Sequence, residues 1–273
     1  MKMKKLAIVA CAGALVAALA LVGCSSGESS TKTSTDKSGS TASGYALVNP
    51  GKLTVAASLD FPPFESLDGD KPVGFAVELM KMLADEMGLE CNYLTTVKFD
   101  TIVPMISAGG KADVGVSSFT INADRAKEID FTEAYMDSNQ SLVVMGNSAY
   151  ADVAQLEGKK IGAQSGTTGY DWAVENIKGA NVIPYDEVTA IFAALQAGQI
   201  DAISIDLPVS QSYIKNAYPD AKIIKETPTG EQYGIVVSKD NPELTKSLNQ
   251  ALAAVKSNGK YEALYSTWFG ATA

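Results

Sequence analysis

Residues 114–131 hold the groups in this chain that are best suited to binding a small charged ligand. An apolar strand ends in a polar stretch that contains Thr120, and a predicted helical turn with one arginine, Arg125, follows. A strand end has free carbonyl and N–H groups, Thr120 adds a hydroxyl, and the planar guanidinium of Arg125 matches a carboxylate. Together these groups suit a zwitterion with a carboxylate and an ammonium group. The alternative is that Arg125 pairs with Glu128 or Asp130 on an exposed turn.

A second candidate group, Asp206, ends an apolar strand in the other half of the chain. Residues 108–117 and residues 197–204 share one order, namely a helix end, glycine, aspartate, an apolar strand and serine. We therefore predict two lobes of the same architecture that face each other. Ligands of α/β sheets bind at the carboxyl ends of strands, so Asp206 is expected to face Arg125 across a cleft. The alternative is that Asp206 caps a helix predicted over residues 207–218.

A third candidate is the sequence Gln-Ser-Gly-Thr-Thr-Gly at residues 164–169. It follows a strand predicted over residues 159–163 and precedes a helix predicted over residues 170–176. Free N–H groups at a helix start and the helix dipole favour an anion, and glycine permits close approach. The stretch lacks the Gly-Lys-Thr/Ser ending of a nucleotide-binding loop and the GxGxxG spacing. A plain helix cap is the equal alternative.

Alternating strands and helices must position these groups in the first half of the folded region. Apolar runs and turn residues predict strands over residues 53–58, 91–97 and 113–120, and helices over residues 75–87 and 101–108. Asp100 is expected to cap the second of these helices. The order strand, helix, strand, helix, strand favours a parallel sheet.

The second half continues in the same way and then returns to the first. Strands are predicted over residues 141–145, 159–163, 181–185, 201–206 and 233–237, and helices over residues 170–176, 188–197, 207–218, 243–257 and 261–269. Asp240 or Asn241 is expected to cap the helix that starts near Pro242. We expect the last helices to cover the first lobe.

The composition allows a full core and disfavours several function classes. The chain has 273 residues, 46% of them hydrophobic, and a net charge of −9. Without residues 1–23, which hold three lysines and no acid, 19 basic and 31 acidic groups leave −12. Nucleic-acid binding is disfavoured, because it depends on Lys and Arg that neutralise phosphates. Histidine is absent, which removes the commonest general base and metal ligand, so we predict no catalytic residue, metal or cofactor.

The N-terminal residues are typical of a targeting segment. Three lysines precede an apolar run that ends in Leu-Val-Gly-Cys24, which resembles a bacterial lipobox. We predict a signal peptide over residues 1–23 and acylation of Cys24, which anchors the protein to the membrane outside the cytoplasm. The alternative is an N-terminal membrane helix with Cys24 as a free thiol. Residues 24–44 are predicted as a flexible Ser/Thr-rich tether, and Cys91 as a buried, inert thiol.

Several motifs occur in order across residues 53–270: Phe61-Pro62-Pro63-Phe64-Glu65, Val73-Gly74-Phe75, residues 113–120, Arg125 with Ile129-Asp130-Phe131, Gln164-Ser165-Gly166-Thr167, Asp206, Gln232-Tyr233-Gly234-Ile235 and Trp268-Phe269-Gly270. Together they resemble bacterial extracellular solute-binding proteins of the polar amino acid family (family 3), the binding components of ABC importers. The resemblance implies a two-lobed, periplasmic-binding-protein-like (type II) α/β fold. Each lobe is then a mostly parallel sheet flanked by helices, and the ligand cleft lies between the lobes. Lobe 1 is expected over residues 45–138 and 233–273, and lobe 2 over residues 139–232.

The resemblance also implies a role for each matching residue in binding an amino acid. Arg125 is expected to hold the α-carboxylate, assisted by N–H groups of Thr120 and of Thr167 or Thr168. The α-ammonium would be bound by Asp206, the Thr120 hydroxyl and the Ser118 carbonyl. The rings of Phe61 and Phe99 would sandwich the ligand. The residues nearest to its side chain would be Ser58, Ser117 and Gln164.

Closure of the lobes on the ligand would be the signal that a permease reads. The crossings between the lobes are expected near residues 137–142 and 230–234. The chain departs from the family at Ser58 and Ala76, where many relatives have Asp. The loss of a cleft carboxylate at Ser58 weakens the case for a cationic ligand, although Asp60 or Glu65 could replace it. Gln164 favours a polar, uncharged side chain.

The resemblance therefore implies a monomeric, lipid-anchored binding protein that delivers an amino acid to an ABC permease, with no enzymatic activity. Two alternatives use the same fold. One is a periplasmic-type enzyme, such as a cyclohexadienyl dehydratase or a lytic transglycosylase, in which Glu65 or Glu133 would be the general acid. Asp206 disfavours the dehydratase, because prephenate lacks an ammonium group. The other alternative is a surface amino acid sensor.

Overall fold

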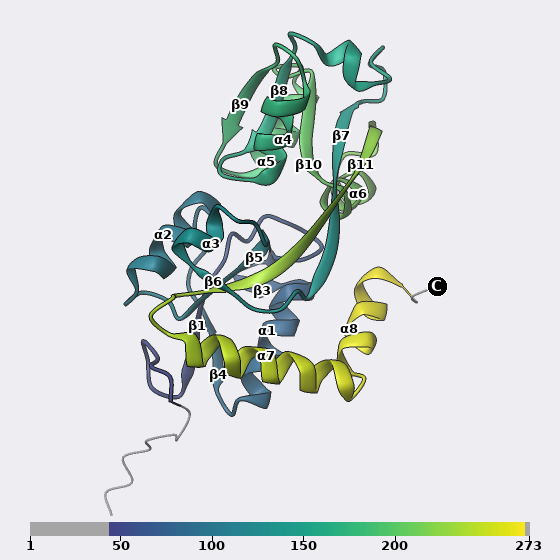
Figure 1. Ribbon diagram of the computed structural model, residues 1–273. Helices are drawn as coiled ribbons and strands as arrows, with labels where there is room; N and C mark the ends of the chain where they lie inside the picture. The colour runs from purple at the N-terminus through teal and green to yellow at the C-terminus, as the bar shows by residue number, and fades with distance from the viewer. Residues whose placement is uncertain (1–43, 271–273) are drawn as a thin grey trace, which may run out of the picture. The chain divides into compact units, whose positions relative to one another are not determined.

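The computed structural model describes residues 44–270, and Figure 1 shows the arrangement of their helices and strands. The predicted signal peptide, the Cys24 acylation site and residues 24–43 of the tether lie outside the described residues and stay predictions. Within residues 44–270, no helix combines the length and the apolar character that a membrane crossing needs.

Nine strands of the described part form one mixed sheet. Its order is β4 (Glu90–Tyr93), β1 (Lys52–Ala56), β5 (Val114–Thr120), β11 (Ala221–Val237), β7 (Met136–Met145), β10 (Ala202–Asp206), β8 (Lys160–Gln164) and β9 (Asn181–Tyr185), with β6 (Asp130–Phe131) paired to β11. A separate hairpin joins β2 (Ser66–Asp68) to β3 (Lys71–Val73). At one end of the sheet β1 pairs in parallel with β4 and β5, and at the other β8 pairs in parallel with β9 and β10. The predicted α/β architecture, with parallel strands in each half, is confirmed.

The helices lie where crossovers between parallel strands require them. They are α1 (Phe75–Glu86), α2 (Phe99–Ala108), α3 (Arg125–Glu128), α4 (Thr168–Asn176), α5 (Val188–Gln196), α6 (Leu207–Asn216), α7 (Pro242–Ser257) and α8 (Lys260–Phe269), with a 3₁₀ turn at Val153–Leu156. The helix predicted over residues 75–87 is observed as α1, and its buried side chains include Phe75, Leu79, Met80 and Leu83. Apolar side chains at this spacing form one helix face, and that face covers the sheet.

Two predicted helix caps are wrong. The helix α2 starts at Phe99 rather than residue 101, so Asp100 lies in its first turn and Lys98 occupies the cap position. Burial explains the earlier start, because the Phe99 ring stacks on Phe119 with 4.6 Å between ring centroids. Asn241 does stand at the start of α7, but its side chain makes no cap bond and instead donates to the Ala46 carbonyl at 2.8 Å.

The two central strands are longer than their sequences predict. Strand β11 spans 17 residues, although only residues 233–237 have a strand pattern, and β7 begins at Met136 rather than residue 141. Most of the additional residues are polar and at least partly exposed, so their pairing with each other across the sheet, not local propensity, keeps them extended. Strand β4 is shorter than predicted and ends at Tyr93.

Strands β7 and β11 connect the two halves of the sheet. Strand β11 pairs with β5 through residues 233–237, whereas β7 pairs with β10 through residues 140–143. Between these regions Gln232 pairs with Asp137 and Glu231 with Ser138, and the ladder is irregular between Thr227 and Glu231. These pairs lie inside the two segments where the lobe crossings are predicted.

The repeated Gly-to-Asp motif occupies equivalent places in the two halves. Asp113, at the start of β5, accepts hydrogen bonds from the N–H groups of Val48 and Thr54, both at 2.7 Å. Asp201, at the start of β10, accepts from the N–H of Lys160 at 2.9 Å and from the Tyr150 hydroxyl at 3.2 Å. In each half the aspartate fastens the start of its strand to the neighbouring parallel strand, β1 or β8.

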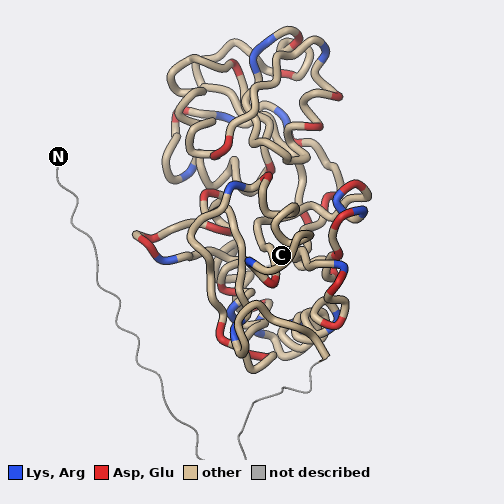
Figure 2. The backbone as a smooth tube through the Cα atoms, turned by 90° about the vertical axis from the view of Figure 1, so that its left-hand side faces the viewer, with Lys and Arg blue, Asp and Glu red and all other residues tan. Residues whose placement is uncertain are grey.

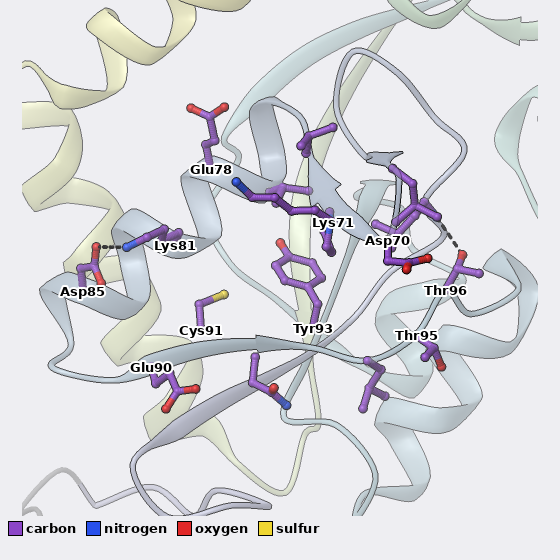
Figure 3. Close-up of a pocket in the computed structure, with 17 residues that line it drawn as sticks. Asp70, Lys71, Glu78, Lys81, Asp85, Glu90, Cys91, Tyr93, Thr95 and Thr96 are labelled. Carbon is purple, nitrogen blue, oxygen red and sulfur yellow. Dashed lines mark hydrogen bonds and ion pairs between the residues drawn. The ribbon is translucent and has the colours of Figure 1, made fainter.

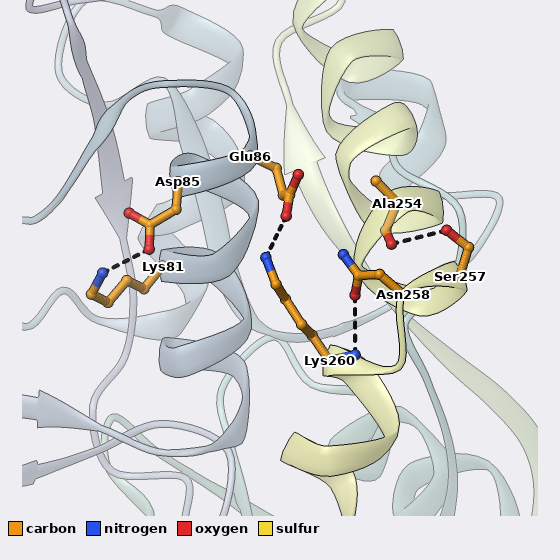
Figure 4. Close-up of polar contacts among 7 residues, drawn as sticks. All are labelled: Lys81, Asp85, Glu86, Ala254, Ser257, Asn258 and Lys260. Atoms are coloured by element: carbon orange, nitrogen blue, oxygen red, sulfur yellow. Dashed lines mark hydrogen bonds and ion pairs between the residues drawn. The ribbon is translucent and has the colours of Figure 1, made fainter.

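The C-terminal helices pack on the first half of the chain. In Figure 1 the yellow helices α7 and α8 lie beside α1, and both contact it. Figure 4 shows Lys260, the first residue of α8, reaching Glu86 at the end of α1, with 2.6 Å between Nζ and Oε1. The turn that precedes α8 is closed by Asn258, whose side-chain oxygen accepts the Lys260 N–H at 3.1 Å.

Charged residues of both signs are interspersed along the chain. Figure 2 shows acidic and basic positions interspersed along the backbone tube. Pairs such as Lys52–Glu90 and Lys81–Asp85 join exposed side chains at 3.0 and 2.8 Å. Exposed pairs of this kind contribute about 0–1 kcal/mol each. The buried charges described next therefore have the larger energetic consequences.

Candidate functional site

A narrow cavity lies where the two halves of the sheet meet. It is lined by Phe61, Phe99, Ser117, Ser118, Thr120, Arg125, Gln164, Thr167, Thr168 and Asp206. These are ten of the eleven ligand-binding residues that the sequence predicts, and they come from the ends of β5, β8 and β10 and from adjacent loops and helix starts. The cavity volume is about 10 Å³, which is room for roughly one water molecule.

Arg125 connects the two halves of the chain at this cavity. Its guanidinium donates from Nη1 to the Thr120 carbonyl at 2.8 Å and from Nη2 to the Gly166 carbonyl at 2.9 Å. Its central carbon lies 5.5 Å from the ring centroids of both Phe99 and Phe119. Burial lowers the pKa of Arg125, and the acidic groups nearby oppose that shift. In the described part Arg125 forms no ion pair on its own turn, so the exposed-turn alternative is not observed.

Asp206 stands at the first position before α6 but does not cap that helix. Its Oδ1 accepts a hydrogen bond from Gln140 Nε2 at 2.7 Å, and its Oδ2 accepts one from the Tyr233 hydroxyl. Burial, followed by the charge of Glu231, raises the pKa of Asp206 to about 7. The helix-cap alternative for Asp206 is therefore wrong, and the carboxyl group faces the junction of the two halves.

Glu231 is a neighbour of the cavity that was not predicted. Its Oε2 accepts hydrogen bonds from Thr120 Oγ1 at 2.8 Å and from Thr168 Oγ1 at 3.0 Å, so it ties β5 to the start of α4. Gln140 Nε2, which donates to Asp206, also lies 3.2 Å from Glu231 Oε2. Glu231 directly precedes the predicted motif that starts at Gln232. Its position as an acidic residue at a predicted lobe crossing was the sequence signal that could have identified it as a neighbour of the cavity.

Glu65 lies buried beneath the cavity and holds Ser118. The Ser118 N–H donates to Glu65 Oε1 at 3.1 Å, and the Ser118 hydroxyl lies 3.0 Å from Oε2. Glu65 is fully buried, and burial raises its pKa well above the ordinary value. It belongs to the predicted Phe-Pro-Pro-Phe-Glu motif, but its contact with Ser118 spans 53 residues and has no local signal.

Ser58 is the one predicted residue that does not line the cavity. It is buried beside it, and its hydroxyl donates to Asp60 Oδ1 at 2.8 Å. Asp60 Oδ2 accepts the N–H of Val188, the first residue of α5, at 2.6 Å, and the Tyr213 hydroxyl donates to the Asp60 carbonyl at 2.8 Å. The Asp60 carboxyl group is therefore already bonded on both oxygens.

The Gly/Ser/Thr-rich stretch is both a helix cap and part of the cavity wall. Thr167 caps α4, because its Oγ1 accepts the Tyr170 N–H at 3.2 Å. Gln164 Nε2 donates to the Asp186 carbonyl at 3.2 Å, which fixes the amide from outside the cavity. A Cβ on Gly169 would lie only 2.9 Å from Gln140 Oε1, so glycine lets α4 approach the crossing strands.

A larger cavity, of about 1040 Å³, lies away from these residues, and Figure 3 shows it between α1, β4 and the β2–β3 hairpin. Its wall includes Lys71, Lys81, Tyr93 and Cys91 but no residue that the sequence predicts to bind ligand. Cys91 is half-buried rather than buried, and burial raises the pKa of its thiol to about 11. A thiol with so high a pKa stays protonated near neutral pH, as an inert cysteine would. Within residues 44–270 no three acidic or cysteine side chains cluster in a way that could hold a metal ion.

Comparison with known proteins places this architecture in one family. Residues 53–271 match the family model of bacterial extracellular solute-binding proteins, family 3. The ABC transporter arginine-binding protein 1 of Escherichia coli K12 is 33% identical over 224 residues, which cover 80% of this chain and 90% of that protein. The L-cystine-binding protein TcyJ of the same strain is 33% identical and covers 81% of this chain and 84% of that protein.

The fold agrees with solved structures of the same kind. A structure of an ancestral arginine-binding protein bound to arginine has a TM-score of 0.75 and 36% identity. That match covers 81% of this chain and 99% of the other. The two-lobed type II fold is thereby confirmed. The chain belongs to the bacterial extracellular solute-binding proteins, family 3.

Proposed function

We propose that this protein captures a free amino acid with a polar, uncharged side chain by cleft closure and delivers it to an ABC importer. The observation that carries the proposal is the joining of Arg125 and Asp206, from different halves of the chain, in the wall of one cavity. A guanidinium and a carboxylate are the complements of the two charged groups that every amino acid has. The names of the related binding proteins for arginine and cystine support an amino acid as the ligand.

The two ends of the ligand would bind to opposite sides of the cavity. Arg125 would pair with the α-carboxylate, assisted by the N–H groups of Thr120 and of the start of α4, at Thr167 or Thr168. Asp206, the Thr120 hydroxyl and the Ser118 carbonyl would bind the α-ammonium. Charge-assisted hydrogen bonds contribute about 1.5–3 kcal/mol each. Four or five of them, less the ordering costs, correspond to a micromolar dissociation constant, roughly −8 kcal/mol.

The nature of the ligand side chain follows from which carboxyl groups line the cavity: Asp206 lines it, whereas Asp60 and Glu65 do not. Asp60 and Glu65 are the two that could replace the carboxylate absent at Ser58. Asp60 is bonded to Ser58 and to the start of α5, and Glu65 is bonded to Ser118. A cationic side chain would have to break one of these arrangements. Ser117, Gln164 and the rings of Phe61 and Phe99 suit a polar, uncharged side chain.

Binding would require the cleft to open and close. A cavity of about 10 Å³ is too small for an amino acid, and Arg125 bonds directly to Gly166 on the other side. We propose that lobe 1 comprises residues 45–138 and 233–273, lobe 2 comprises residues 139–232, and the lobes separate about β7 and β11. A ligand that contacts both lobes stabilises the closed form by its differential contacts.

The N-terminal residues supply the location that we propose. Cleavage after residue 23 and acylation of Cys24 would anchor the protein to the outer face of the cell membrane, with residues 24–44 as a tether. The folded part would act as a monomer next to its permease.

Ligand-dependent thermal unfolding of residues 43–273, freed of bound metabolites by a denaturing wash, tests the proposal. We expect a few related polar amino acids, among the twenty common ones and cystine, to raise the unfolding midpoint, because a ligand of the native state stabilises it. Arg125→Ala and Asp206→Ala should abolish the rise. Lys127→Ala, which removes an exposed cation next to Arg125, is the matched control and should keep it.

Several results would contradict the proposal. A midpoint that no amino acid raises, or a rise that survives both substitutions, would exclude the assigned site. A rise with prephenate, followed by turnover of prephenate, would favour the dehydratase alternative. Binding without any role in amino acid uptake by cells would favour the sensor.

A further inference from the structure

The backbone of β5 is irregular where it reaches the cavity. Gly115 pairs with Val236 of β11, and Phe119 pairs with Gly234, so residues 116–118 face the single residue Ile235. Ile235 is itself occupied, since its N–H and carbonyl both bond to Thr132. The N–H of Ser118 therefore has no partner in the strand ladder. Bulges of this kind occur next to binding sites, where they redirect side chains and backbone groups.

Ser118 has an unusual backbone conformation within this bulge. Its φ angle is +51°, and among residues 44–270 it is the one residue other than glycine with a positive φ. The left-handed conformation is unfavourable for a residue with a Cβ, so surrounding contacts must hold it. Ser118 is 5% exposed and lines the cavity, so the bulge directs it to the proposed ligand.

Glu65 supplies the contacts that the strand ladder does not. Its Oε1 accepts the Ser118 N–H at 3.1 Å, and the Ser118 hydroxyl lies 3.2 Å from Oε1 and 3.0 Å from Oε2. Ser117 is held separately, because its Oγ accepts the Ser58 N–H at 3.2 Å. Glu65 and Ser58 thus fasten the two consecutive serines of the bulge.

The surrounding sequence holds Glu65 in this place. Residues 61–65 form a tight turn in which the Phe61 N–H donates to the Glu65 carbonyl at 2.7 Å and the Glu65 N–H donates back at 3.1 Å. The turn lies against the start of α1 at Gly74, where a Cβ would be 2.1 Å from the Phe64 carbonyl oxygen. The Phe64 ring also packs edge-on against Tyr233, with centroids 5.3 Å apart.

We propose that Glu65 is a positioning residue for amino acid binding: it holds the β5 bulge in the left-handed turn that presents Ser118 to the ammonium end of the ligand. Glu65 acts through Ser118 and does not touch the ligand itself. The inference rests on the proposed function, because it assumes that an α-amino acid binds in this cavity. It assigns the acidic residue of the Phe-Pro-Pro-Phe-Glu motif to recognition rather than to acid catalysis.

Calorimetric titration of Glu65 variants with L-glutamine, L-arginine and L-cystine tests this proposal. Burial favours a neutral carboxyl group, so Glu65→Gln keeps the shape and an acceptor oxygen, and its affinity should stay within about threefold of the parent protein. Glu65→Leu leaves the Ser118 N–H without a partner and should weaken binding about tenfold or more. Glu90→Gln, at an exposed carboxylate of lobe 1, is the control and should change nothing.

A second comparison leaves Glu65 intact, so it works even if Glu65→Leu does not fold. Ser118→Ala and Ser118→Gly both remove the hydroxyl, but only glycine adopts the left-handed conformation without cost. The glycine variant should bind about threefold or more tightly than the alanine variant. Glycine at position 118 should also recover part of the affinity that Glu65→Leu loses.

Hydrogen exchange of the Ser118 amide separates failure of this inference from failure of the proposed function. If the parent protein binds no amino acid, the proposed function fails. The Ser118 amide should still be protected in the parent and Glu65→Gln proteins and exchange faster in Glu65→Leu. Equal exchange in all three, or binding that Glu65→Leu leaves unchanged, would overturn the positioning role.

Discussion

The strands β5 and β10 begin alike and end differently. Each is preceded by glycine and opened by an aspartate, Asp113 or Asp201, that accepts a backbone N–H of the adjacent parallel strand. Strand β5 then runs into the bulge at Ser118, a residue that lines the cavity. Strand β10 stays regular and ends in the carboxyl group of Asp206.

This difference separates the part of the repeat that builds the fold from the part that makes the site. The strand starts are equivalent because both halves must join a strand to its parallel neighbour. In the proposed function the unlike strand ends match the unlike ends of a zwitterion, because one set of groups cannot bind both. Arg125 lies after β5 and Asp206 at the end of β10, so a symmetric pair of lobes has an asymmetric cleft.

Removal of the aspartates that precede β5 and β10 should have the largest effect, and that effect should be a loss of stability. Asp113→Ala leaves two backbone N–H groups without an acceptor in a site that is 7% exposed, which should cost about 3 kcal/mol of unfolding free energy. Asp201→Ala affects a more exposed site and should cost about 1–2 kcal/mol. Urea unfolding measures both. Equal losses would contradict the comparison, as would a fall in amino acid affinity larger than the fall in stability.

Replacement of Arg125 by lysine should have the next largest effect, and that effect should be a loss of ligand affinity. Lysine keeps the charge but loses the planar fork and the contact with the rings of Phe99 and Phe119. The affinity for the amino acid found by thermal unfolding should fall about 100-fold, or roughly 2.7 kcal/mol, by calorimetry. Lys127→Arg is the control. Full affinity in Arg125→Lys would show that charge alone suffices at this end of the cleft.

The end formed by Asp206 should make binding depend on pH. Its pKa in the folded protein is about 7, above the ordinary 3.8, so the folded protein binds more protons between these values. The stability of the ligand-free protein should therefore fall as pH rises from about 4 to about 7, with Glu65 contributing in the same direction. The ligand ammonium favours the carboxylate, so affinity should rise by up to about tenfold per pH unit below pH 7 and level off above it. Asp206→Asn should remove this dependence of affinity, and an unchanged profile in that variant would contradict the assignment.

Glu231→Gln should have the smallest effect on affinity, and it tests whether Glu231 raises the pKa of Asp206. The charge of Glu231 contributes to the raised pKa of Asp206, so its removal should move the midpoint of the affinity profile to lower pH. The loss of a charged acceptor for Thr120 and Thr168 should change affinity at pH 8 by only about threefold. Calorimetry between pH 5 and 8 measures both quantities. A midpoint that moves upward would show that Glu231 does not act on Asp206 by repulsion.

Local sequence patterns predict most of the fold and part of the cavity wall, and the family resemblance predicts the rest of that wall. Apolar periodicity identifies the strands and the buried face of α1, and the repeated Gly-to-Asp motif identifies the equivalent strands β5 and β10. Because parallel strands end at the same edge of a sheet, residues such as Arg125, Thr168 and Asp206 could be predicted to meet. The errors at Asp100 and Asn241 concern single caps, where burial of Phe99 and the contact with Ala46 outweigh local preference.

Only the tertiary structure decides which acidic groups line the cavity and which partners each of them has. Glu65 and Ser118 are 53 residues apart, Thr120 and Glu231 are 111 apart, and Asp60 and Val188 are 128 apart. The long pairing of β7 with β11 likewise overrides the polar sequence of residues 222–232. The sequence by itself determined the two lobes and the charged groups at their strand ends, because periodicity and turn chemistry act over a few residues. The bulge at Ser118, the sharing of Gln140 by Asp206 and Glu231 and the bonds of Asp60 were decided by contacts between distant parts of the chain, because three-dimensional proximity chooses the partners of a buried polar group.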